Sequence, residues 1–218
     1  MFFRFSTKIC ALHNENVSKV LTKHGFNVPK TQVIKINSEF CEVYPFIEGT
    51  TLFERSLNHD ISPEKIRKIY KQMIDILYEL RTIPCYEINE EYDKCQPLLH
   101  RIVHEYFKDI NQSKNTVCHY DLTDKNILLD NQNNICGILD LDSVTKGSFE
   151  LSLIRLAVES FRQGLDLKDI YILCSLRFDH NFRYLENYVK KYVFYRNIYW
   201  LFCGKYFKNI QTLQNTQK

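Results

Sequence analysis

Residues 119–142 read H-Y-D-L-T-D-K-N-I-L-L-D-N-Q-N-N-I-C-G-I-L-D-L-D, and this stretch decides what the chain folds into. Two apolar runs, 127–129 and 135–141, have the length and composition of buried strands. The segment between them, 130–134, consists of Asp, Asn and Gln. Asp and Asn tolerate a left-handed backbone and hydrogen-bond their own main chain, so they favour a turn. The pattern therefore predicts a β-hairpin over residues 127–141.

The predicted hairpin carries polar side chains where the chain enters and leaves it. Asp121 and Asn126 lie on the loop that enters the first strand, and Asp140 lies at the exit of the second. A hairpin of this length can bring all three to one end, around a common cation. Mg²⁺ prefers oxygen ligands and takes few of them from the protein, the others being phosphate and water. Asn126 offers a neutral oxygen and Asp140 a charged one, so the pair is a candidate magnesium site.

The order of these elements is more specific than any one of them. An isolated D-x-x-x-x-N pattern is common, because Asp and Asn also serve turns and helix caps. The order H-x-D-x-x-x-x-N, hairpin, I-L-D is much rarer, and it resembles the aminoglycoside phosphotransferase and choline kinase superfamily. The resemblance implies an α+β, two-lobed, protein-kinase-like fold whose mainly helical C-lobe carries the catalytic hairpin. It also implies ATP- and Mg-dependent transfer of a phosphate to a small-molecule hydroxyl.

The resemblance assigns a role to each residue of the motif. Asp121 would be the catalytic base that receives the hydroxyl proton, while Asn126 and Asp140 would hold the magnesium ion that bridges the ATP phosphates. His119 belongs to the catalytic group, where it is expected to brace the loop by hydrogen bonds rather than act as a base. Asp142 could assist the metal or bind the acceptor, and a solvated carboxylate is an equal alternative.

A second matching segment, Glu42–Gly49, reads E-V-Y-P-F-I-E-G. It resembles the fifth strand of the small lobe and the hinge between the two lobes. In such folds the hinge backbone pairs with adenine, so Pro45, Phe46 and Ile47 are the implied nucleotide contacts. Residues 28–30, V-P-K, resemble the V-P-[KR] that follows the first helix of the small lobe.

The N-terminal residues resemble the part of the small lobe that grips the phosphates. Phe2–Phe5 is similar to the third strand of that lobe, whose basic residue contacts ATP, and Arg4 is the candidate with Lys8 as its rival. Glu15, inside a helix expected from about residue 12 to 23, matches the acidic helix residue that pairs with that base. The plainer interpretation is that Arg4 is an exposed strand residue and Glu15 a solvated helix residue.

Two features depart from the family pattern. The two strands and the phosphate-covering loop that usually precede the third strand have no counterpart before Arg4, so the N-lobe is expected to be truncated. The chain would then be a truncated paralogue, a chain with a mispredicted start, or a minimal version completed by a partner. After Gly147, the family often places an Asp where this chain has Ser152, which can cap a helix but brings no charge.

The expected lobes are residues 1–49, which would bind nucleotide, and residues 50–218, which would carry catalysis and bind the acceptor. Ser62-Pro63 is a strong helix start. The apolar residues that follow recur at steps of three and four, so they predict a helix through residue 81. Further helices are expected near 98–110, 151–161, 167–178 and 181–207, and strands near 32–36, 40–46 and 116–118.

The last helical region carries aromatic residues at steps of three and four, namely Tyr188, Tyr192, Tyr195, Tyr199, Phe202 and Tyr206, with Trp200 beside them. Such spacing places them on one helix face. A buried seam is the favoured interpretation, because aromatic side chains dominate protein cores. The alternative is an aromatic wall, with Trp200 as a candidate acceptor-binding residue, that takes a choline-like cation through cation–π contacts.

The composition is that of a globular protein, with 44% hydrophobic and 25% charged residues. A net charge of +3 with dispersed basic residues does not make a nucleic-acid footprint. The eight cysteines form no C-x-x-C pair and have no zinc-type spacing with His. No run of about twenty apolar residues predicts a membrane span. A reduced, cytoplasmic protein is therefore expected.

The expected activity is phosphate transfer to an aminoglycoside, a choline-like alcohol or a related metabolite. The alternative is a catalytically impaired, kinase-like binding or scaffold protein, which the truncated lobe and Ser152 motivate. Protein-kinase activity is disfavoured, because no A-P-E-like element follows Asp140. The sequence leaves open the acceptor, the oligomeric state and whether Met1 is the true start.

Overall fold

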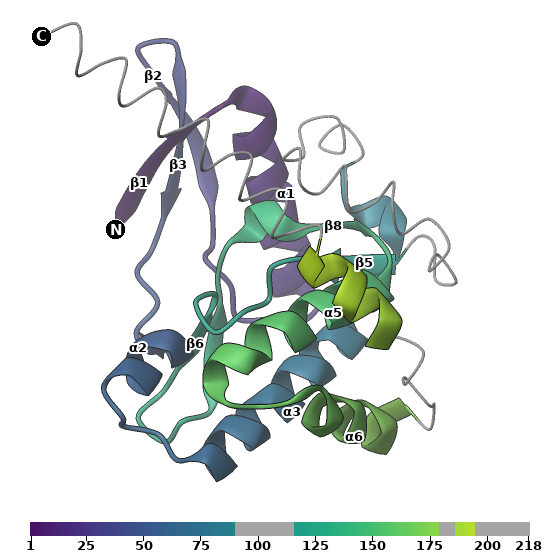
Figure 1. Ribbon diagram of the computed structural model, residues 1–218. Coiled ribbons are helices and arrows are strands. Elements are labelled where there is room, and N and C mark those ends of the chain that lie inside the picture. Colours follow the sequence, from purple (N-terminus) through teal and green to yellow (C-terminus); the bar gives the residue numbers. More distant parts are fainter. Residues whose placement is uncertain (90–115, 179–185, 195–218) are drawn as a thin grey trace, which may run out of the picture.

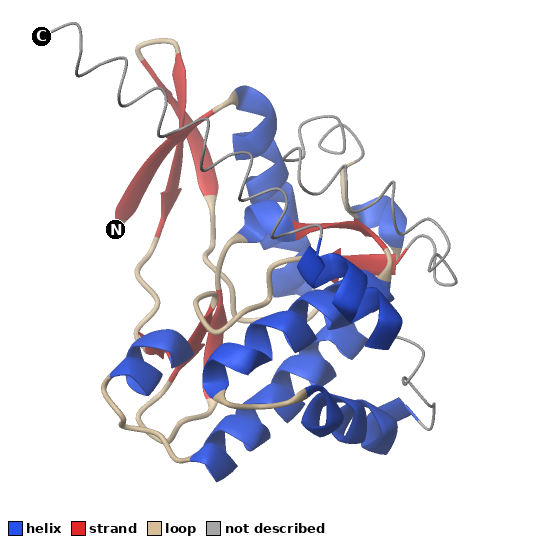
Figure 2. Ribbon diagram, in the orientation of Figure 1, coloured by secondary structure: helices blue, strands red, loops and turns tan. Residues whose placement is uncertain are grey.

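The computed structural model describes residues 1–89, 116–178 and 186–194. Figure 1 shows a small antiparallel sheet beside one helix, and below them a larger part in which helices predominate. Figure 2 shows the same division by secondary structure, with the remaining short strands inside the larger part. The expected two-lobed α+β architecture is confirmed, whereas the division at residue 49 stays a prediction.

Three strands and one helix form the small lobe: β1 (Phe2–Ser6), α1 (Lys8–Lys23), β2 (Gln32–Ile36) and β3 (Glu39–Tyr44). The central strand β3 pairs antiparallel with β1 on one side and β2 on the other. This register places Arg4 directly opposite Glu42. Directly opposed residues of an antiparallel pair point to the same face of the sheet, so these two side chains are neighbours.

Helix α1 begins four residues before the expected start at residue 12. Thr7 is its N-cap, and the Thr7 hydroxyl accepts a hydrogen bond from the Cys10 N–H at 3.3 Å. The first turn is exposed at Lys8 and Ile9, so no apolar periodicity marks it in the sequence. The cap, which is a polar signal, therefore sets the start of the helix.

The larger lobe contains β4 (Thr50–Thr51), α2 (Leu52–Leu57), α3 (Pro63–Leu80), β5 (Thr116–His119), β6 (Ile127–Leu129), β7 (Ile135–Ile138), β8 (Val144–Gly147), α5 (Phe149–Ser160) and α6 (Leu167–Phe178). A further helix covers residues 186–194. Short 3-10 turns lie at Cys85–Glu87, Leu141–Ser143 and Phe161–Gln163. The strands β4 and β8 and the helix α2 were not predicted.

Helix α3 is the centre of the core, and its predicted start and apolar stripe are confirmed. Ser62 caps it, with Pro63 in the first turn. Its buried residues are Ile66, Ile69, Tyr70, Met73, Ile74, Leu77 and Leu80. Helices α5 and α6 both pack against α3, which gives the lobe a continuous apolar interior.

The predicted hairpin is present as β6 and β7, joined by a turn at residues 130–134. The Asp130 carboxylate organises this turn, because Oδ1 accepts from the N–H groups of Gln132 and Asn134 at 2.8 Å each. Strand β7 ends at Ile138, three residues before the expected end. Asp140 has φ 59° and ψ 60°, a left-handed conformation that cannot continue a strand.

Part of the sequence prediction falls outside the described residues. The helix expected at 98–110, Trp200 and most of the helix expected at 181–207 belong to that part. Two members of the aromatic series are described: Tyr192 lies in the core cluster and Tyr188 packs against it. Both therefore fit the buried-seam interpretation. No helix of the described chain is long and apolar enough to cross a bilayer.

The core position of α3 predicts a strong dependence of stability on its apolar face. Leu77→Ala is expected to lower the free energy of unfolding by about 2–5 kcal/mol, because Leu77 is fully buried and the truncation leaves a cavity. Lys71→Ala, on the exposed side of the same helix, is the control and should change stability by less than about 0.5 kcal/mol. Urea denaturation of the two variants measures the difference, and equal effects would contradict this packing.

Candidate active site

The loop between β5 and β6 holds Asp121 and Asn126 against each other. The Asn126 side chain donates through Nδ2 to the Asp121 backbone oxygen at 2.8 Å and to Asp121 Oδ2 at 3.0 Å. The Asn126 backbone oxygen accepts from the Leu139 N–H at 2.8 Å. Because Leu139 directly precedes Asp140, these bonds bring all three predicted polar residues to one end of the hairpin.

Asp140 is held in place by its own local contacts. Its left-handed backbone ends the strand, and the Ser143 hydroxyl donates to Asp140 Oδ2 at 2.8 Å. No group of three or more His, Cys, Asp or Glu side chains in the described chain could hold a metal ion. Asn126 and Asp140 stay the predicted protein ligands of a magnesium ion.

His119 makes two contacts that hold the loop against the hairpin. It is buried, its Nε2 lies 3.0 Å from the Leu139 backbone oxygen, and its Nδ1 accepts from the Asp121 N–H at 3.2 Å. A neutral imidazole protonated on Nε2 satisfies both contacts. Burial lowers the pKa of His119 against the opposing effects of Asp140, the Leu139 carbonyl and Asp121. His119 therefore serves as a neutral brace for the loop.

Arg155 is a site residue that the sequence reasoning missed. From helix α5, its Nε and Nη2 both donate to Asp121 Oδ1, at 3.0 and 2.7 Å. Its Nη1 pairs with Glu159 at 2.8 Å and donates to the Tyr192 hydroxyl at 3.3 Å. Burial alone would lower the pKa of Arg155, but Tyr192, Asp121 and Glu159 raise it, so the guanidinium stays charged. An arginine in the middle of the apolar run 151–158 was the available signal.

The base of the loop is anchored by a second set of contacts, to the turn that follows α5. Asp124 is fully buried and accepts from Arg162 at 2.8 Å and from Gln163 at 2.6 Å. Ser152 does not cap α5, because the helix begins one residue after Ser148. The Ser152 hydroxyl is buried and has no hydrogen-bond partner among the described residues. Ser152 therefore gives the loop no hydrogen bond from the described part of the chain.

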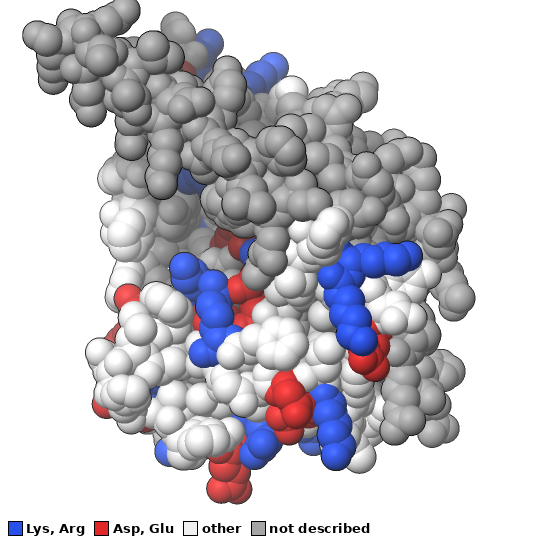
Figure 3. All heavy atoms as spheres, viewed as in Figure 1, with Lys and Arg blue, Asp and Glu red and all other residues white. Residues whose placement is uncertain are grey.

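The charge around the loop is mixed. Figure 3 shows Lys and Arg side chains next to Asp and Glu side chains over the described part of this face. Arg162 contacts both Asp124 and Glu159, and Lys125 lies over the ring of Phe53 at 4.7 Å. The described part of this face therefore has no patch of one sign.

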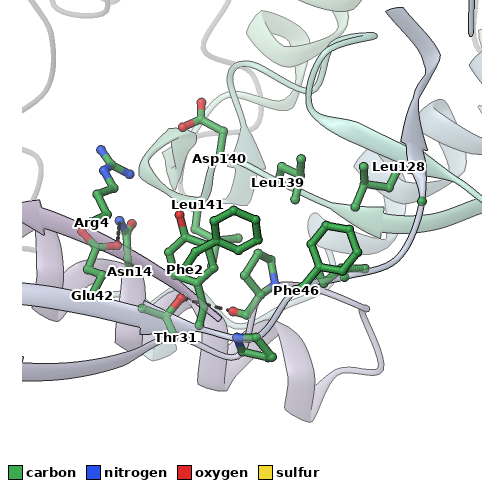
Figure 4. A pocket seen from close by; sticks show the side chains of 15 residues that line it. Phe2, Arg4, Asn14, Thr31, Glu42, Phe46, Leu128, Leu139, Asp140 and Leu141 are labelled. Carbon is green, nitrogen blue, oxygen red and sulfur yellow. Dashed lines mark hydrogen bonds between the residues drawn. The ribbon is translucent and has the colours of Figure 1, made fainter. Parts of the chain in front are cut away.

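A cavity of about 300 Å³ separates the small sheet from the hairpin. It is lined by Phe2, Arg4, Asn14, Pro29, Thr31, Glu42, Tyr44, Pro45, Phe46, Ile47, Gly49, Leu128, Leu139, Asp140 and Leu141. Figure 4 shows the aromatic and aliphatic side chains at one end and the polar ones at the other. The three predicted hinge residues thus share a cavity with Arg4 and Asp140.

The predicted pair of Arg4 and Glu15 is wrong. Arg4 forms an ion pair with Asp142, while Glu15 accepts from the Val33 N–H at 3.2 Å and pairs with Lys19 at 2.9 Å. Successive residues of a helix point about 100° apart. Helix α1 is turned so that the residue before Glu15 faces the cavity.

That residue is Asn14, which joins two carboxylates. Its Nδ2 donates to Glu42 at 2.9 Å and to Asp142 at 2.6 Å. Asp142 therefore contacts the small lobe, and the solvated alternative for this carboxylate is also wrong. Lys8, the rival of Arg4, is exposed on the first turn of α1 and does not line the cavity.

No protein-family model and no curated protein sequence matches the chain. Solved structures do match. Aminoglycoside phosphotransferase APH(3'')-Id from Streptomyces rimosus has a TM-score of 0.63 at 14% identity, over 87% of this chain and 82% of that one. ADP-bound aminoglycoside phosphotransferase APH(2'')-Ib has a TM-score of 0.53 at 14% identity, over 92% and 83%.

A third structure, the gentamicin complex of APH(2'')-IIa, has a TM-score of 0.52 at 16% identity, over 87% of this chain and 72% of that one. At these identities the likeness concerns the fold alone. The chain has the kinase-like fold of the aminoglycoside phosphotransferases, as the sequence resemblance implied.

The buried imidazole predicts how stability depends on pH. The pKa of His119 in the folded protein lies below the unfolded value of about 6.5. Below that pH the unfolded chain binds a proton that the folded chain does not bind. The contribution of His119 is therefore complete above about pH 6.5 and is lost as the pH falls, by at most about 1.4 kcal/mol per pH unit.

Urea denaturation between pH 7 and pH 5 measures this dependence. His119→Gln is the matched control, because its side-chain amide can still donate toward Leu139 but does not titrate in this range. The wild type should lose more stability than the variant over the interval. Parallel pH profiles would show that His119 does not remain neutral in the folded state.

Proposed function

We propose that the chain transfers the γ-phosphate of ATP to the hydroxyl of a small molecule, with Mg²⁺ as cofactor. The observation that carries the proposal is the meeting of Asp121, Asn126 and Asp140 at one end of the hairpin, beside the cavity. The structural neighbours support it, since APH(3'')-Id has been solved with ADP and streptomycin, and APH(2'')-Ib with ADP.

The cavity supports nucleotide binding through its division into two ends. The apolar end has the ring of Phe2 at 5.8 Å from Phe46 and 6.0 Å from Tyr44, and these rings offer apolar surface to a purine. The hinge backbone at 45–47 would pair with adenine. The polar end holds Arg4, whose guanidinium suits the geometry of phosphate oxygens. ATP would therefore lie with its base at the hinge and its phosphates toward Asp140.

The donor set fits a magnesium ion. Asn126 donates to Asp121 through its Nδ2, so within the described chain its Oδ1 remains for a cation. Asp140 shares Oδ2 with Ser143 and keeps Oδ1. An amide oxygen and a carboxylate oxygen are hard ligands of the kind that Mg²⁺ takes beside phosphate and water. The ion, when bound, would neutralise charge on the phosphate oxygens.

The protein's own part in the reaction is positioning and proton transfer. Asp121 accepts the proton of the acceptor hydroxyl as the oxygen attacks the γ-phosphorus. Asn126 and Arg155 fix the carboxylate from both sides, and His119 fixes the loop that carries it. Such catalysis draws most of its rate from orientation and electrostatic stabilisation. The acceptor classes are aminoglycosides, choline-like alcohols and related metabolites.

The second candidate function is a catalytically impaired binding or scaffold protein. One observation favours it: both oxygens of Asp121 accept hydrogen bonds within the protein, Oδ1 from Arg155 and Oδ2 from Asn126. A base held in this way must still have room for a hydroxyl proton. Calorimetry with ATP and Mg²⁺ separates the candidates in part, because a folded chain without nucleotide affinity would support the scaffold.

The proposed role of Asp121 as the base predicts that its substitution gives a variant that binds ATP but transfers phosphate slowly. Asp121→Asn is expected to lower the rate of phosphate transfer about 10²–10⁴-fold, because the amide cannot accept the proton. Its affinity for ATP and Mg²⁺ should stay within about twofold. The assay follows labelled phosphate from ATP to streptomycin, gentamicin and choline. Wild-type transfer to an acceptor, with equal activity in the variant, would remove Asp121 from the mechanism.

The contacts of Arg155 predict a separate effect, on the orientation of the Asp121 carboxylate. Arg155→Lys keeps the charge but cannot donate twice to Asp121 Oδ1, so kcat should fall about tenfold, which corresponds to about 1.4 kcal/mol. The KM for ATP should not change. Tyr192→Phe is the control, because it removes one contact of Arg155 and leaves the pair with Asp121. A rise in KM with unchanged kcat would contradict a positioning role.

A further inference from the structure

Glu42 carries a buried carboxylate oxygen that lacks a partner. The residue is 2% exposed, its Oε2 accepts from Asn14 at 2.9 Å, and its Oε1 has no hydrogen-bond partner among the described residues. Leaving a buried polar atom unsatisfied costs about 1–3 kcal/mol, and more for a charged group. At the wall of a cavity, such an oxygen is available to a donor that moves next to it.

The neighbour best placed to become that partner is Arg4. The strand register puts Arg4 and Glu42 directly opposite each other, where Cβ atoms are typically about 4.5–5.5 Å apart. Both residues line the cavity, and Figure 4 shows them with Asn14 at the same polar end. Burial lowers the pKa of Arg4, but Asp142, Glu42 and Asp140 raise it, so the charge of Glu42 already acts on the guanidinium.

Asp142, the present partner of Arg4, is poorly placed to hold the guanidinium while nucleotide is bound. Asp142 lies two residues beyond Asp140, which lines the end of the cavity where the phosphates and their cation would sit. A guanidinium that turns toward phosphate needs a second carboxylate that does not compete for the same space. Glu15 does not provide it in this structure, because its oxygens contact the Val33 N–H and Lys19.

We propose that Glu42, on strand β3, is the positioning residue that anchors Arg4 on the nucleotide phosphates. The proposal rests on the proposed function. The carboxylate that holds the phosphate-binding arginine thus comes from the neighbouring strand and not from helix α1. On helix α1, Asn14 bridges the carboxylates of Glu42 and Asp142 through the two hydrogen bonds of its Nδ2.

The variant Glu42→Gln separates this role from a structural one. Its side-chain oxygen can still accept from Asn14 Nδ2, and its new amide can donate to Asn14 Oδ1, which is also buried without a partner. The substitution removes a buried charge and satisfies two orphaned atoms, so the variant should be as stable as the wild type or more stable. Affinity for nucleotide and stability should therefore move in opposite directions.

The test is calorimetric titration of the full chain with Mg²⁺ and a non-hydrolysable ATP analogue, together with thermal unfolding. Glu42→Gln should weaken binding about tenfold with an unchanged or higher Tm, whereas the matched control Glu15→Gln should bind within about twofold of the wild type. In an Arg4→Ala background, Glu42→Gln should have no further effect on binding, because its action passes through Arg4.

Three results would overturn the proposal, and they differ from a failure of the proposed function. Normal binding by Glu42→Gln, a tenfold loss in Glu15→Gln, or additive losses in the double variant would each show that Glu42 does not anchor Arg4. A wild type that is folded but binds no nucleotide would instead remove the proposed function, and this inference with it.

Discussion

The site depends on two hydrogen bonds of one buried, neutral imidazole. His119 joins the Leu139 carbonyl on the hairpin exit to the Asp121 N–H on the hairpin entry, and a third bond links the Leu139 N–H to Asn126. A charged imidazolium could not accept from Asp121, so the geometry requires the neutral form that burial enforces. The places of Asp121, Asn126 and Asp140 follow from this arrangement.

The cavity depends in turn on bonds between the lobes. The Ile138 N–H donates to the Asn27 carbonyl at 3.0 Å, and the Asn27 side chain donates to the Cys136 carbonyl. A buried ring nitrogen of His13 lies 2.9 Å from the Val144 carbonyl. These contacts join the small lobe to β7 and β8. Arg4 from one lobe and Asp140 from the other therefore line the same cavity.

The sequence could predict what local periodicity and turn chemistry determine. The hairpin turn around Asp130 and the stripe of α3 are such cases, and both are present as expected. Strand β8 was missed, because Val144–Gly147 has no apolar run and is held as a strand by pairing with β5. Its partner lies more than twenty residues away in sequence, where no local pattern can indicate it.

The rotation of a helix about its axis and the partners of long-range ion pairs were equally hard to predict. Asn14 and Glu15 are both polar, so the pattern of α1 does not say which one faces the cavity, and packing against β3 decides it. Arg155 meets Asp121 across 34 residues of sequence. A charged residue in an apolar helix can be noticed in the sequence, but the identity of its partner comes only from the fold.

The number of hydrogen bonds that a carboxylate can accept bears on whether Asp121 can serve as a base. An ionised carboxylate offers about four acceptor positions. Asp121 uses three within the described chain, two on Oδ1 for Arg155 and one on Oδ2 for Asn126, so one position on Oδ2 remains. A hydroxyl can approach only along that direction. Phosphoryl transfer gains more from orientation than from basicity, so this restriction is compatible with catalysis. If Asp121 is the base, the bonds that favour an inactive protein at first sight would also leave a single path for the acceptor.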